Sequence, residues 1–287
     1  MPEAVEIVEV GPRDGLQNEK GVIATEDKIA LIDLLSNAGF ARIEAASFVS
    51  PKWVPQMADG GAVMAGITRA DGVRYMALTP NMQGFERALA ARVDQVAIFA
   101  AASEGFSRAN INATIDESLT RFAPVMAAAR DHAIPVRAYV SCVTDCPYDG
   151  PVAPGAVADV AARLLDLGAV EISLGETLGH GTAEAVDAML TAVTKRVPAN
   201  LLAGHFHDTG GVALANIDVA LSHGVRIFDA AVGGLGGCPY AKGAKGNVAT
   251  ERVMRHLEAA GYTTGLRSEI VDQAAEMARA MRGKDSE

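Results

Sequence analysis

Two histidines placed two residues apart could hold a metal ion. They are His205 and His207, in the run Gly-His-Phe-His-Asp that ends a predicted apolar strand. Side chains at i and i+2 of a strand face the same side, so both imidazoles would enter one pocket. Hydrogen-bonded core histidines are the alternative, but two inward imidazoles are costly to bury unless something binds them. Two histidines alone suit zinc, nickel or iron; oxygen groups of Asp14 and Asn247 shift the preference toward Mg2+ or Mn2+, without excluding zinc.

An arginine and an aspartate follow the first predicted strand, as Arg13 and Asp14 in Gly-Pro-Arg-Asp-Gly. A surface turn is the commoner setting for such a pair. Directly after a buried strand, however, a guanidinium can hold an oxyanion through two parallel hydrogen bonds. Glu44 lies in the middle of the second predicted strand, and a carboxylate buried there needs a partner. We therefore predict that Arg13 pairs with Glu44.

A glycine-rich run between residues 232 and 247 carries a cysteine. The run holds six glycines, two lysines, Cys238 and the closing Asn247. So much glycine is unsuited to a core strand and predicts a mobile loop, which could carry a reactive thiol over a site. A flexible surface loop with an incidental thiol is the alternative. The ordinary thiol pKa of about 8.5 suits proton transfer near neutral pH, so Cys238 is a candidate general acid.

Apolar segments of strand length alternate with amphipathic segments of helix length along the chain. Eight such pairs predict an α/β fold, a (β/α)8 TIM barrel; a doubly wound open sheet, which usually has fewer strands, is the alternative. The predicted strands are residues 5–10, 41–47, 73–78, 93–99, 136–142, 169–174, 202–207 and 225–232. The predicted helices are residues 25–38, 57–67, 82–91, 114–132, 154–167, 182–197, 213–223 and 248–260.

A further helical segment at residues 268–282 would pack outside the barrel or on a partner. We predict one catalytic domain over residues 1–287, with the barrel at about 5–262 and an added C-terminal helix and tail at 263–287. In such a barrel the chemistry occurs at the C-terminal ends of the strands. The candidate residues above fall at or near these ends.

Composition and charge exclude several classes of protein. The formal charge of −10 argues against nucleic acid and anionic membranes as partners, since both need a basic surface. Three cysteines are too few for a disulfide framework, the N-terminal residues lack a basic export region, and no apolar run is long enough to span a membrane. We therefore expect a cytoplasmic protein. The chain also lacks the P-loop, the dinucleotide-binding and the G-x-S-x-G motifs.

Three motifs together resemble those of one enzyme family. They are GPRDGLQNE at residues 11–19, SFVSPKWVPQM at 47–57 and GLGGCPYA at 234–241. The first also occurs in related forms across a wider superfamily of metal-dependent Claisen-type enzymes, whereas the other two are more specific. In these motifs the chain resembles the 3-hydroxy-3-methylglutaryl-CoA lyase family from about residue 5 to residue 266.

The resemblance implies a TIM barrel that cleaves (S)-3-hydroxy-3-methylglutaryl-CoA to acetyl-CoA and acetoacetate in leucine degradation and ketone-body metabolism. It implies a homodimer with a divalent cation, Mg2+ or Mn2+. The implied metal ligands are Asp14, His205, His207 and Asn247. The implied catalytic residues are Arg13, Cys238, His205, Glu44 and Glu176. The implied substrate-binding residues are Arg13, Gln17, Lys20, Ser47, Asn110, Ser173 and Thr177, with Lys20 and Asn110 toward the CoA moiety. One departure is Glu176, where these lyases often have aspartate.

The implied reaction is a retro-Claisen cleavage assisted by the cation. The base that takes the hydroxyl proton is Asp14, His205 or Glu176, and the sequence does not choose among them. Arg13 would stabilise the enolate oxygen, and Cys238 would protonate the carbanion. Four alternatives stay open: a lyase for a longer branched 3-hydroxyglutaryl-CoA, an enzyme joining acetyl-CoA to a 2-oxo acid, a zinc hydrolase, and a non-catalytic metal-binding barrel.

Overall fold

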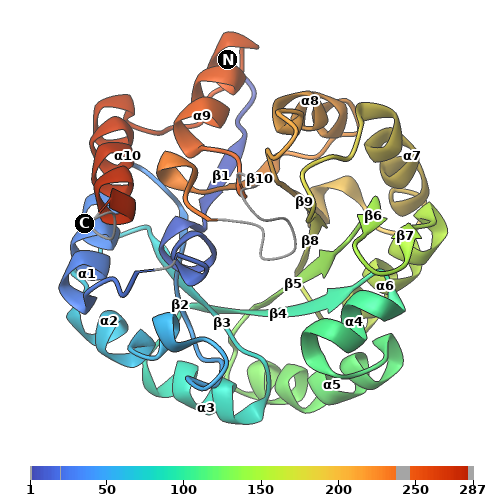
Figure 1. Cartoon of the computed structure of the whole chain (residues 1–287), viewed down its shortest axis with the longest axis horizontal. Coiled ribbons are helices and arrows are strands. Elements are labelled where there is room, and N and C mark those ends of the chain that lie inside the picture. The colour runs from blue at the N-terminus through green and yellow to red at the C-terminus, as the bar shows by residue number, and fades with distance from the viewer. Residues whose placement is uncertain (1, 20, 237–245, 284–287) are drawn as a thin grey trace.

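Eight parallel strands form a closed barrel in the computed structural model, which describes residues 2–19, 21–236 and 246–283 (Figure 1). Around the barrel the strands follow one another in the order β1-β10-β9-β8-β5-β4-β3-β2. Closure confirms the predicted TIM barrel and rules out the open sheet. The barrel strands are β1 (Glu6–Glu9), β2 (Arg42–Ser47), β3 (Arg74–Leu78), β4 (Gln95–Ala101), β5 (Val136–Ser141), β8 (Glu171–Glu176), β9 (Leu202–Phe206) and β10 (Ile227–Ala230).

Helices surround the strands, as the alternating pattern predicted (Figure 1). Local signals set their ends. Thr114 and Glu117 form a reciprocal capping box at the start of one helix. Pro154 lies in the first turn of another helix, and Gly168, just after the end of that same helix, adopts a left-handed φ of 109°. The helices are α1 (Thr25–Ser36), α2 (Gly60–Gly66), α3 (Met82–Ala90), α4 (Glu104–Ile111), α5 (Ile115–Asp131), α6 (Pro154–Asp166), α7 (Ala183–Val193), α8 (Ala213–Ser222), α9 (Thr250–Ala259) and α10 (Ser268–Gly283).

One helix and one two-stranded hairpin were not predicted. Helix α4 follows β4 but is short and contains Gly105, so its apolar period is too weak to read from the sequence. The hairpin of β6 (Asp145–Cys146) and β7 (Gly150–Pro151) has two residues in each strand, below the length at which alternation can be recognised. Helix α2 also begins later than residue 57, because Pro55–Met57 forms a separate 3-10 turn.

The barrel interior is charged as well as apolar. On β5, Arg137 and Tyr139 hydrogen-bond to side chains of other barrel strands, whereas Ala138 and Val140 belong to the apolar layer between strands and helices. This alternation follows from the two-residue period of a strand. Ion pairs therefore occupy part of the space that side chains such as Val, Leu and Ile usually fill in a TIM barrel.

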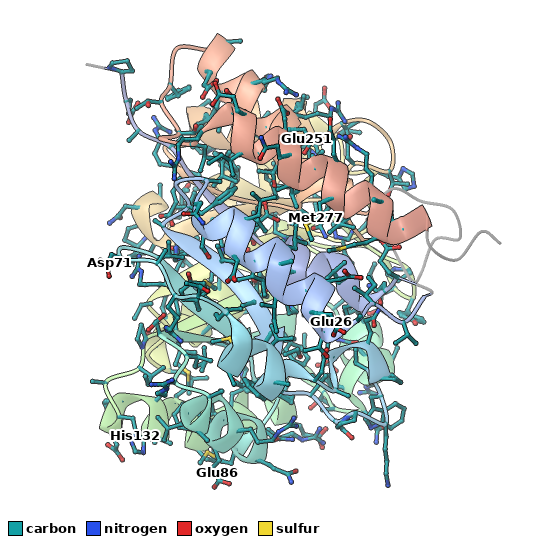
Figure 2. All side chains as sticks on the ribbon, turned by 90° about the vertical axis from the view of Figure 1, so that its left-hand side faces the viewer. Glu26, Asp71, Glu86, His132, Glu251 and Met277 are labelled. Carbon is teal, nitrogen blue, oxygen red and sulfur yellow. The ribbon has the colours of Figure 1, made fainter. Side chains whose placement is uncertain are left out.

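Helix α10 is the predicted addition outside the barrel. It packs against α1, α9 and the turn Val232–Gly234, and Figure 2 shows it beside α1 on the face turned to the viewer, with Met277 between them. Val271, Ala274 and Ala278 on its inner side are fully buried. Within the described residues, no helix combines the length and apolar character needed to cross a membrane.

Candidate active site

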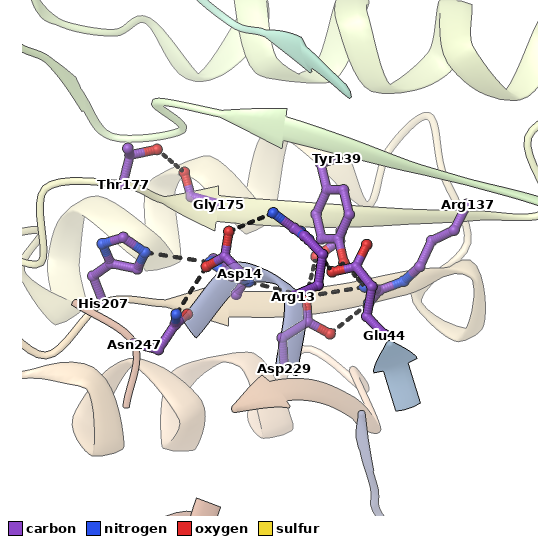
Figure 3. A network of polar contacts seen from close by, with 12 residues as sticks. Arg13, Asp14, Glu44, Arg137, Tyr139, Gly175, Thr177, His207, Asp229 and Asn247 are labelled. Carbon is purple, nitrogen blue, oxygen red and sulfur yellow. Dashed lines mark hydrogen bonds and ion pairs between the residues drawn. The ribbon is translucent and has the colours of Figure 1, made fainter. Parts of the chain in front are cut away.

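Two imidazoles and a carboxylate converge at the mouth of the barrel. Figure 3 shows His207 and Asn247 beside Asp14. His205 lies on β9 and His207 directly after it; their Nε2 atoms are 3.3 Å apart. Oδ2 of Asp14 lies 4.0 Å from Nε2 of His205. The nearest ligand atoms of the three residues all lie within 4.8 Å of one another. Such a group of two nitrogens and an oxygen can hold a divalent cation.

Asn247 joins this cluster through both its backbone and its side chain. Its backbone forms an isolated bridge with His207, which sets the two residues side by side. Its amide Nδ2 donates to Oδ2 of Asp14 at 2.8 Å and to the carbonyl of Leu235 at 3.3 Å. The structure therefore brings together the four residues predicted as metal ligands.

A wide π-helical turn, Gly11–Gly15, presents Arg13 and Asp14 at the end of β1. The amides of residues 13, 14 and 15 all point to the carbonyl of Val10, at 3.2, 2.8 and 3.2 Å. Arg13 then extends between two carboxylates: its Nε donates to Glu44 at 2.7 Å and its NH1 to Asp14 at 2.6 Å. The predicted pair of Arg13 with Glu44 is thus present, and the same guanidinium also holds Asp14.

Glu9 fixes this turn from behind. Its buried carboxylate accepts hydrogen bonds from the amides of Gly11 and Val232, at 2.8 and 2.9 Å, and from the Thr250 hydroxyl at 2.7 Å. A Cβ at residue 11 would lie 2.6 Å from Oε1 of Glu9, so a larger residue there would displace this carboxylate from its hydrogen bonds. Burial raises the pKa of Glu9 to about 7. The Glu9 carboxyl group therefore links the segment after β1 to the segment after β10, and both segments border the site.

The electrostatics of the mouth favour a cation. Burial opposes ionisation of Asp14, yet Arg13 and the neighbouring imidazoles lower its pKa to about 2. Burial, together with His205, lowers the pKa of His207 to about 4, so its ring is neutral and can offer a lone pair. Burial opposes protonation of His205, but Asp229 and Asp14 raise the pKa of its ring above the ordinary value. A cation would bind the deprotonated ring, and the Asp14 and Glu44 carboxyl groups would then face the single guanidinium of Arg13. The carboxylate, amide and imidazole donors thus fit a divalent ion in chemistry and in charge.

Asp229 on β10 orients His205 and was missed by the sequence analysis. It is fully buried and lies 3.1 Å from Nδ1 of His205, which leaves Nε2 facing Asp14. It also accepts from Ser173 at 2.8 Å and from both terminal nitrogens of Arg137, at 3.0 and 2.7 Å. Burial opposes its ionisation, but Arg137 holds the pKa of Asp229 far below its usual range. A carboxylate behind a histidine in this way fixes the ring and raises its basicity as a ligand.

Tyr139 was also missed and links the two arginines. Its hydroxyl donates to Glu44 at 3.1 Å and accepts from Arg137 at 3.0 Å. The guanidinium of Arg13 lies over its ring, 5.5 Å from the centroid, and the ring meets His205 edge-on. The available signal was the spacing of Arg137 and Tyr139, two polar side chains on one face of an otherwise apolar strand.

The predicted substrate-binding residues, unlike the predicted metal ligands, do not all lie in one cluster. The Ser173 hydroxyl donates a hydrogen bond to Asp229. Oγ of Ser47 accepts a hydrogen bond from the backbone amide of Val49 at 3.4 Å. Oγ1 of Thr177 accepts from the amide of Cys142 at 2.9 Å. These three side chains already make contacts within the protein.

Gln17, Asn110 and Glu176 lie in three different surroundings. Gln17 lines a pocket of about 310 Å3, together with residues of the 18–22 and 53–56 segments. Asn110 is exposed on α4. Glu176, at the end of β8, is buried and contacts Thr144 at 3.3 Å; burial raises its pKa. Lys20 and Cys238 lie outside the described residues.

Comparison with known proteins identifies the family of this fold and site. The HMGL-like family model matches residues 4–278. A curated protein of Pseudomonas aeruginosa, named 3-hydroxy-3-isohexenylglutaryl-CoA/hydroxy-methylglutaryl-CoA lyase, is 54% identical over 286 residues, which cover 100% of this chain and 95% of that protein.

Two solved structures have the same fold. The HMG-CoA lyase of Brucella melitensis is 59% identical with a TM-score of 0.97, over 98% of this chain and 99% of that one. An HMG-CoA lyase of Acinetobacter baumannii, solved with coenzyme A and 3-methylmalate, is 36% identical with a TM-score of 0.93, over 98% and 92%. These matches confirm the resemblance seen in the three sequence motifs, and the chain belongs to the HMGL-like family, that of the 3-hydroxy-3-methylglutaryl-CoA lyases.

Proposed function

We propose that the protein cleaves (S)-3-hydroxy-3-methylglutaryl-CoA to acetyl-CoA and acetoacetate, and that it acts in leucine degradation. The observation that carries this proposal is the cluster of Asp14, His205 and His207 beside Arg13, in a chain matched over its full length by lyases of this name. The substrate must lose a hydroxyl proton while the bond to the thioester α-carbon breaks, and the thioester side leaves as an enolate.

A divalent cation, Mg2+ or Mn2+, would be held by Asp14, His205, His207 and the amide oxygen of Asn247. When bound, it supplies Lewis acidity that lowers the pKa of a substrate hydroxyl and fixes its geometry. Asp229 keeps His205 turned toward the ion, and Arg13 keeps Asp14 ionised.

Arg13 would hold the developing enolate oxygen. It is buried, and Glu44, Asp14 and the Tyr139 ring fix its position, so little reorganisation is needed as charge forms. Glu44 acts through Arg13 and is a positioning residue. Cys238 is proposed as the acid that protonates the enolate carbon, a role that rests on the sequence motif because the residue lies outside the described part of the chain.

The base that takes the hydroxyl proton is proposed to be His205 or Glu176. Asp14 is disfavoured because its pKa of about 2 makes it a weak base. Burial raises the pKa of Glu176, and its Oε2 has no hydrogen-bond partner among the described residues. Glu176→Gln separates the two candidates: loss of most turnover with unchanged metal affinity assigns the base to Glu176, and retained turnover assigns it to His205.

The substrate's CoA and acyl groups are proposed to contact six residues: Arg13, Gln17, Lys20, Ser47, Asn110 and Thr177. Ser173, the seventh predicted residue, donates to Asp229 and is proposed to act through that carboxylate. The ligands of the Acinetobacter baumannii structure support a site for a coenzyme A compound. A second substrate is favoured by the name of the Pseudomonas aeruginosa relative, which includes a longer branched isohexenyl analogue. Measuring kcat/KM for both acyl-CoA substrates decides between a narrow and a broad acyl site.

The test of the proposed function is incubation with 3-hydroxy-3-methylglutaryl-CoA and Mg2+, with acetoacetate and acetyl-CoA measured separately. Equal amounts of both products, lost with a chelator and restored by Mg2+, are expected. Arg163→Lys, in a surface ion pair with Asp116, is the control variant and should leave the rate unchanged. No acetoacetate from the metal-loaded protein would contradict the proposal.

We further propose one catalytic domain over residues 1–287, a homodimer, and a cytoplasmic location. Cys142 and Cys146 are buried free thiols, which suits a reducing compartment. Sedimentation equilibrium tests the dimer, and cell fractionation tests the location. A single cooperative unfolding transition tests the domain assignment.

A further inference from the structure

Two arginines on helix α10 reach from outside the barrel to the segment that follows β10. Arg279 and Arg282 are three residues apart and therefore project from the same side of the helix. Their targets are the residues around Gly233, Gly234 and Gly236. These contacts are separate from the polar network that holds Arg13 and His205.

Arg282 makes the larger set of contacts. Its NH2 donates to the carbonyls of Gly234 and Gly236, at 2.6 and 3.0 Å, and its Nε donates to Glu19 at 2.7 Å. The amide of Gly236 lies 3.3 Å from the same Glu19 oxygen. One guanidinium therefore ties the loop after β1 to the segment after β10.

Arg279 supports the same segment one turn earlier. Its NH2 donates to Oε1 of Glu251 at 2.5 Å, and the other oxygen of Glu251 accepts from the amide of Gly233 at 3.0 Å. Glu251 is buried on α9. Each arginine thus holds a glutamate that in turn accepts a hydrogen bond from a glycine amide.

The held segment needs such support because of its backbone. Gly233, Gly234 and Gly236 have φ values of 67°, 63° and 112°, in the left-handed region that favours glycine. Glycine loses the most conformational freedom on folding, so three of them in four residues are ordered only when their surroundings hold them.

The same segment forms a wall of the proposed cation site. The carbonyl of Leu235 accepts from the Asn247 amide, which also donates to Asp14. A Cβ on Gly236 would lie 2.9 Å from Nδ2 of Asn247, and one on Gly15 would lie 2.6 Å from Cβ of Leu235. With this close packing, a shift of residues 234–236 would move Asn247 and the turn that carries Asp14.

We infer that Arg282 is a positioning residue for the cation site, with Arg279 as a second support. It acts through Gly234, Gly236 and Glu19 on Asn247 and Asp14, although it lies on the helix added outside the barrel. The inference rests on the proposed function only in that the cluster binds a divalent cation.

The test compares three variants by Mn2+ titration without substrate, in which electron paramagnetic resonance measures the free Mn2+. Arg282→Ala should weaken Mn2+ binding about 10-fold, at the lower end of the usual effect of removing support behind metal ligands. Arg282→Lys should lie between this and wild type, because one ammonium cannot reach both carbonyls and Glu19. Arg255→Ala is the matched control: it removes an exposed ion pair of α9 with Asp272 on α10, 2.5 Å long, away from the glycines.

Amide hydrogen exchange gives a second readout that needs no metal. Arg282→Ala should raise the exchange rate of peptides covering residues 232–236, whereas Arg255→Ala should leave it as in wild type. Unchanged Mn2+ affinity and exchange in Arg282→Ala, or equal changes in Arg255→Ala, would overturn the inference while the proposed function stands. A wild-type protein that binds no Mn2+ would overturn both.

Discussion

The floor and the mouth of the barrel are both built from buried charges, but they treat those charges differently. At the floor, near the N-terminal ends of the strands, Arg42 contacts Glu6 and Glu171, and Arg137 contacts Glu171 and Asp229. Both oxygens of Glu6, Glu171 and Asp229 accept a hydrogen bond from one of these two guanidinium groups. These pairs are satisfied within the protein, so the floor has little left to offer a ligand.

The mouth leaves binding capacity unused. Arg13 also pairs with two carboxylates, those of Asp14 and Glu44, but Oε1 of Glu44 has no hydrogen-bond partner among the described residues. Burial raises the pKa of Glu44, whereas arginine contacts lower those of Glu171 and Asp229 against the effect of burial. The difference teaches that a buried charge is structural when its partners are complete and is available for chemistry when they are not.

Arg13→Lys, at the mouth, should have the largest effect, and the effect should be on catalysis. Lysine keeps the charge but loses the planar fork that holds Glu44 and an enolate oxygen together. We expect kcat to fall about 10^3-fold, the upper range for loss of one oxyanion donor, with little change in melting temperature. Steady-state kinetics and thermal unfolding measure the two effects; a kcat within tenfold of wild type would contradict the role of Arg13.

Arg137→Met, at the floor, should lower the stability of the folded protein. It leaves Asp229 buried without its guanidinium and Glu171 with Arg42 alone, which should cost about 3–5 kcal/mol of the free energy of unfolding at pH 7. Arg69→Met, which removes a partly exposed pair with Asp94, is the control and should cost under about 1 kcal/mol. Urea unfolding measures both; equal losses would contradict the distinction.

The pH dependence sharpens the same comparison. In the folded protein the pKa values of Asp229 and Glu171 lie below their unfolded values. Their stabilisation is therefore fully present above about pH 4 and is lost as the pH falls through the folded values. In Arg137→Met, protonation of Asp229 also removes its uncompensated charge, so the difference in stability between wild type and variant should narrow below about pH 4. A gap that widens in acid would contradict the ion-pair explanation.

Asp229→Asn tests the residue that belongs to both regions. It keeps the shape of the side chain but removes the charge that holds His205 and Arg137. We expect Mn2+ affinity to fall about 10- to 100-fold, the usual loss when the residue behind a ligating histidine is changed. The Mn2+ titration is made at a temperature at which circular dichroism shows that the variant is folded. Unchanged Mn2+ affinity would show that Asp229 does not support the metal ligands.

Ser173→Ala should have the smallest effect. The sequence predicts a substrate-binding role, but the hydroxyl donates to Asp229. Loss of this hydrogen bond should cost about 1 kcal/mol of stability and leave KM within threefold. A tenfold rise in KM would instead support direct contact with the substrate.

Much of the mouth could be predicted because its signals are local. The two-residue spacing of His205 and His207 places both rings on one side of a strand, and position after a buried strand marks Arg13 and Asp14. The partner of Glu44 followed from the cost of burying a lone carboxylate. Chain order and periodicity were therefore enough for these residues and for the barrel.

The remainder depends on contacts across the barrel that no local pattern encodes. Arg137 and Asp229 are 92 residues apart, and only the closed strand order brings β5 and β10 to face one interior. Arg282 looks like an ordinary solvated charge on an amphipathic helix until α10 is docked beside Gly234. Register and docking, rather than residue type, decide these pairs.

The most direct measurement of the central claim is a crystal structure of the protein grown with Mn2+, with anomalous diffraction used to locate the ion. The account predicts one anomalous peak at the barrel mouth, within bonding distance of Asp14, His205 and His207. A peak elsewhere, or a mouth in which the two imidazoles bind no ion at saturating Mn2+, would contradict it.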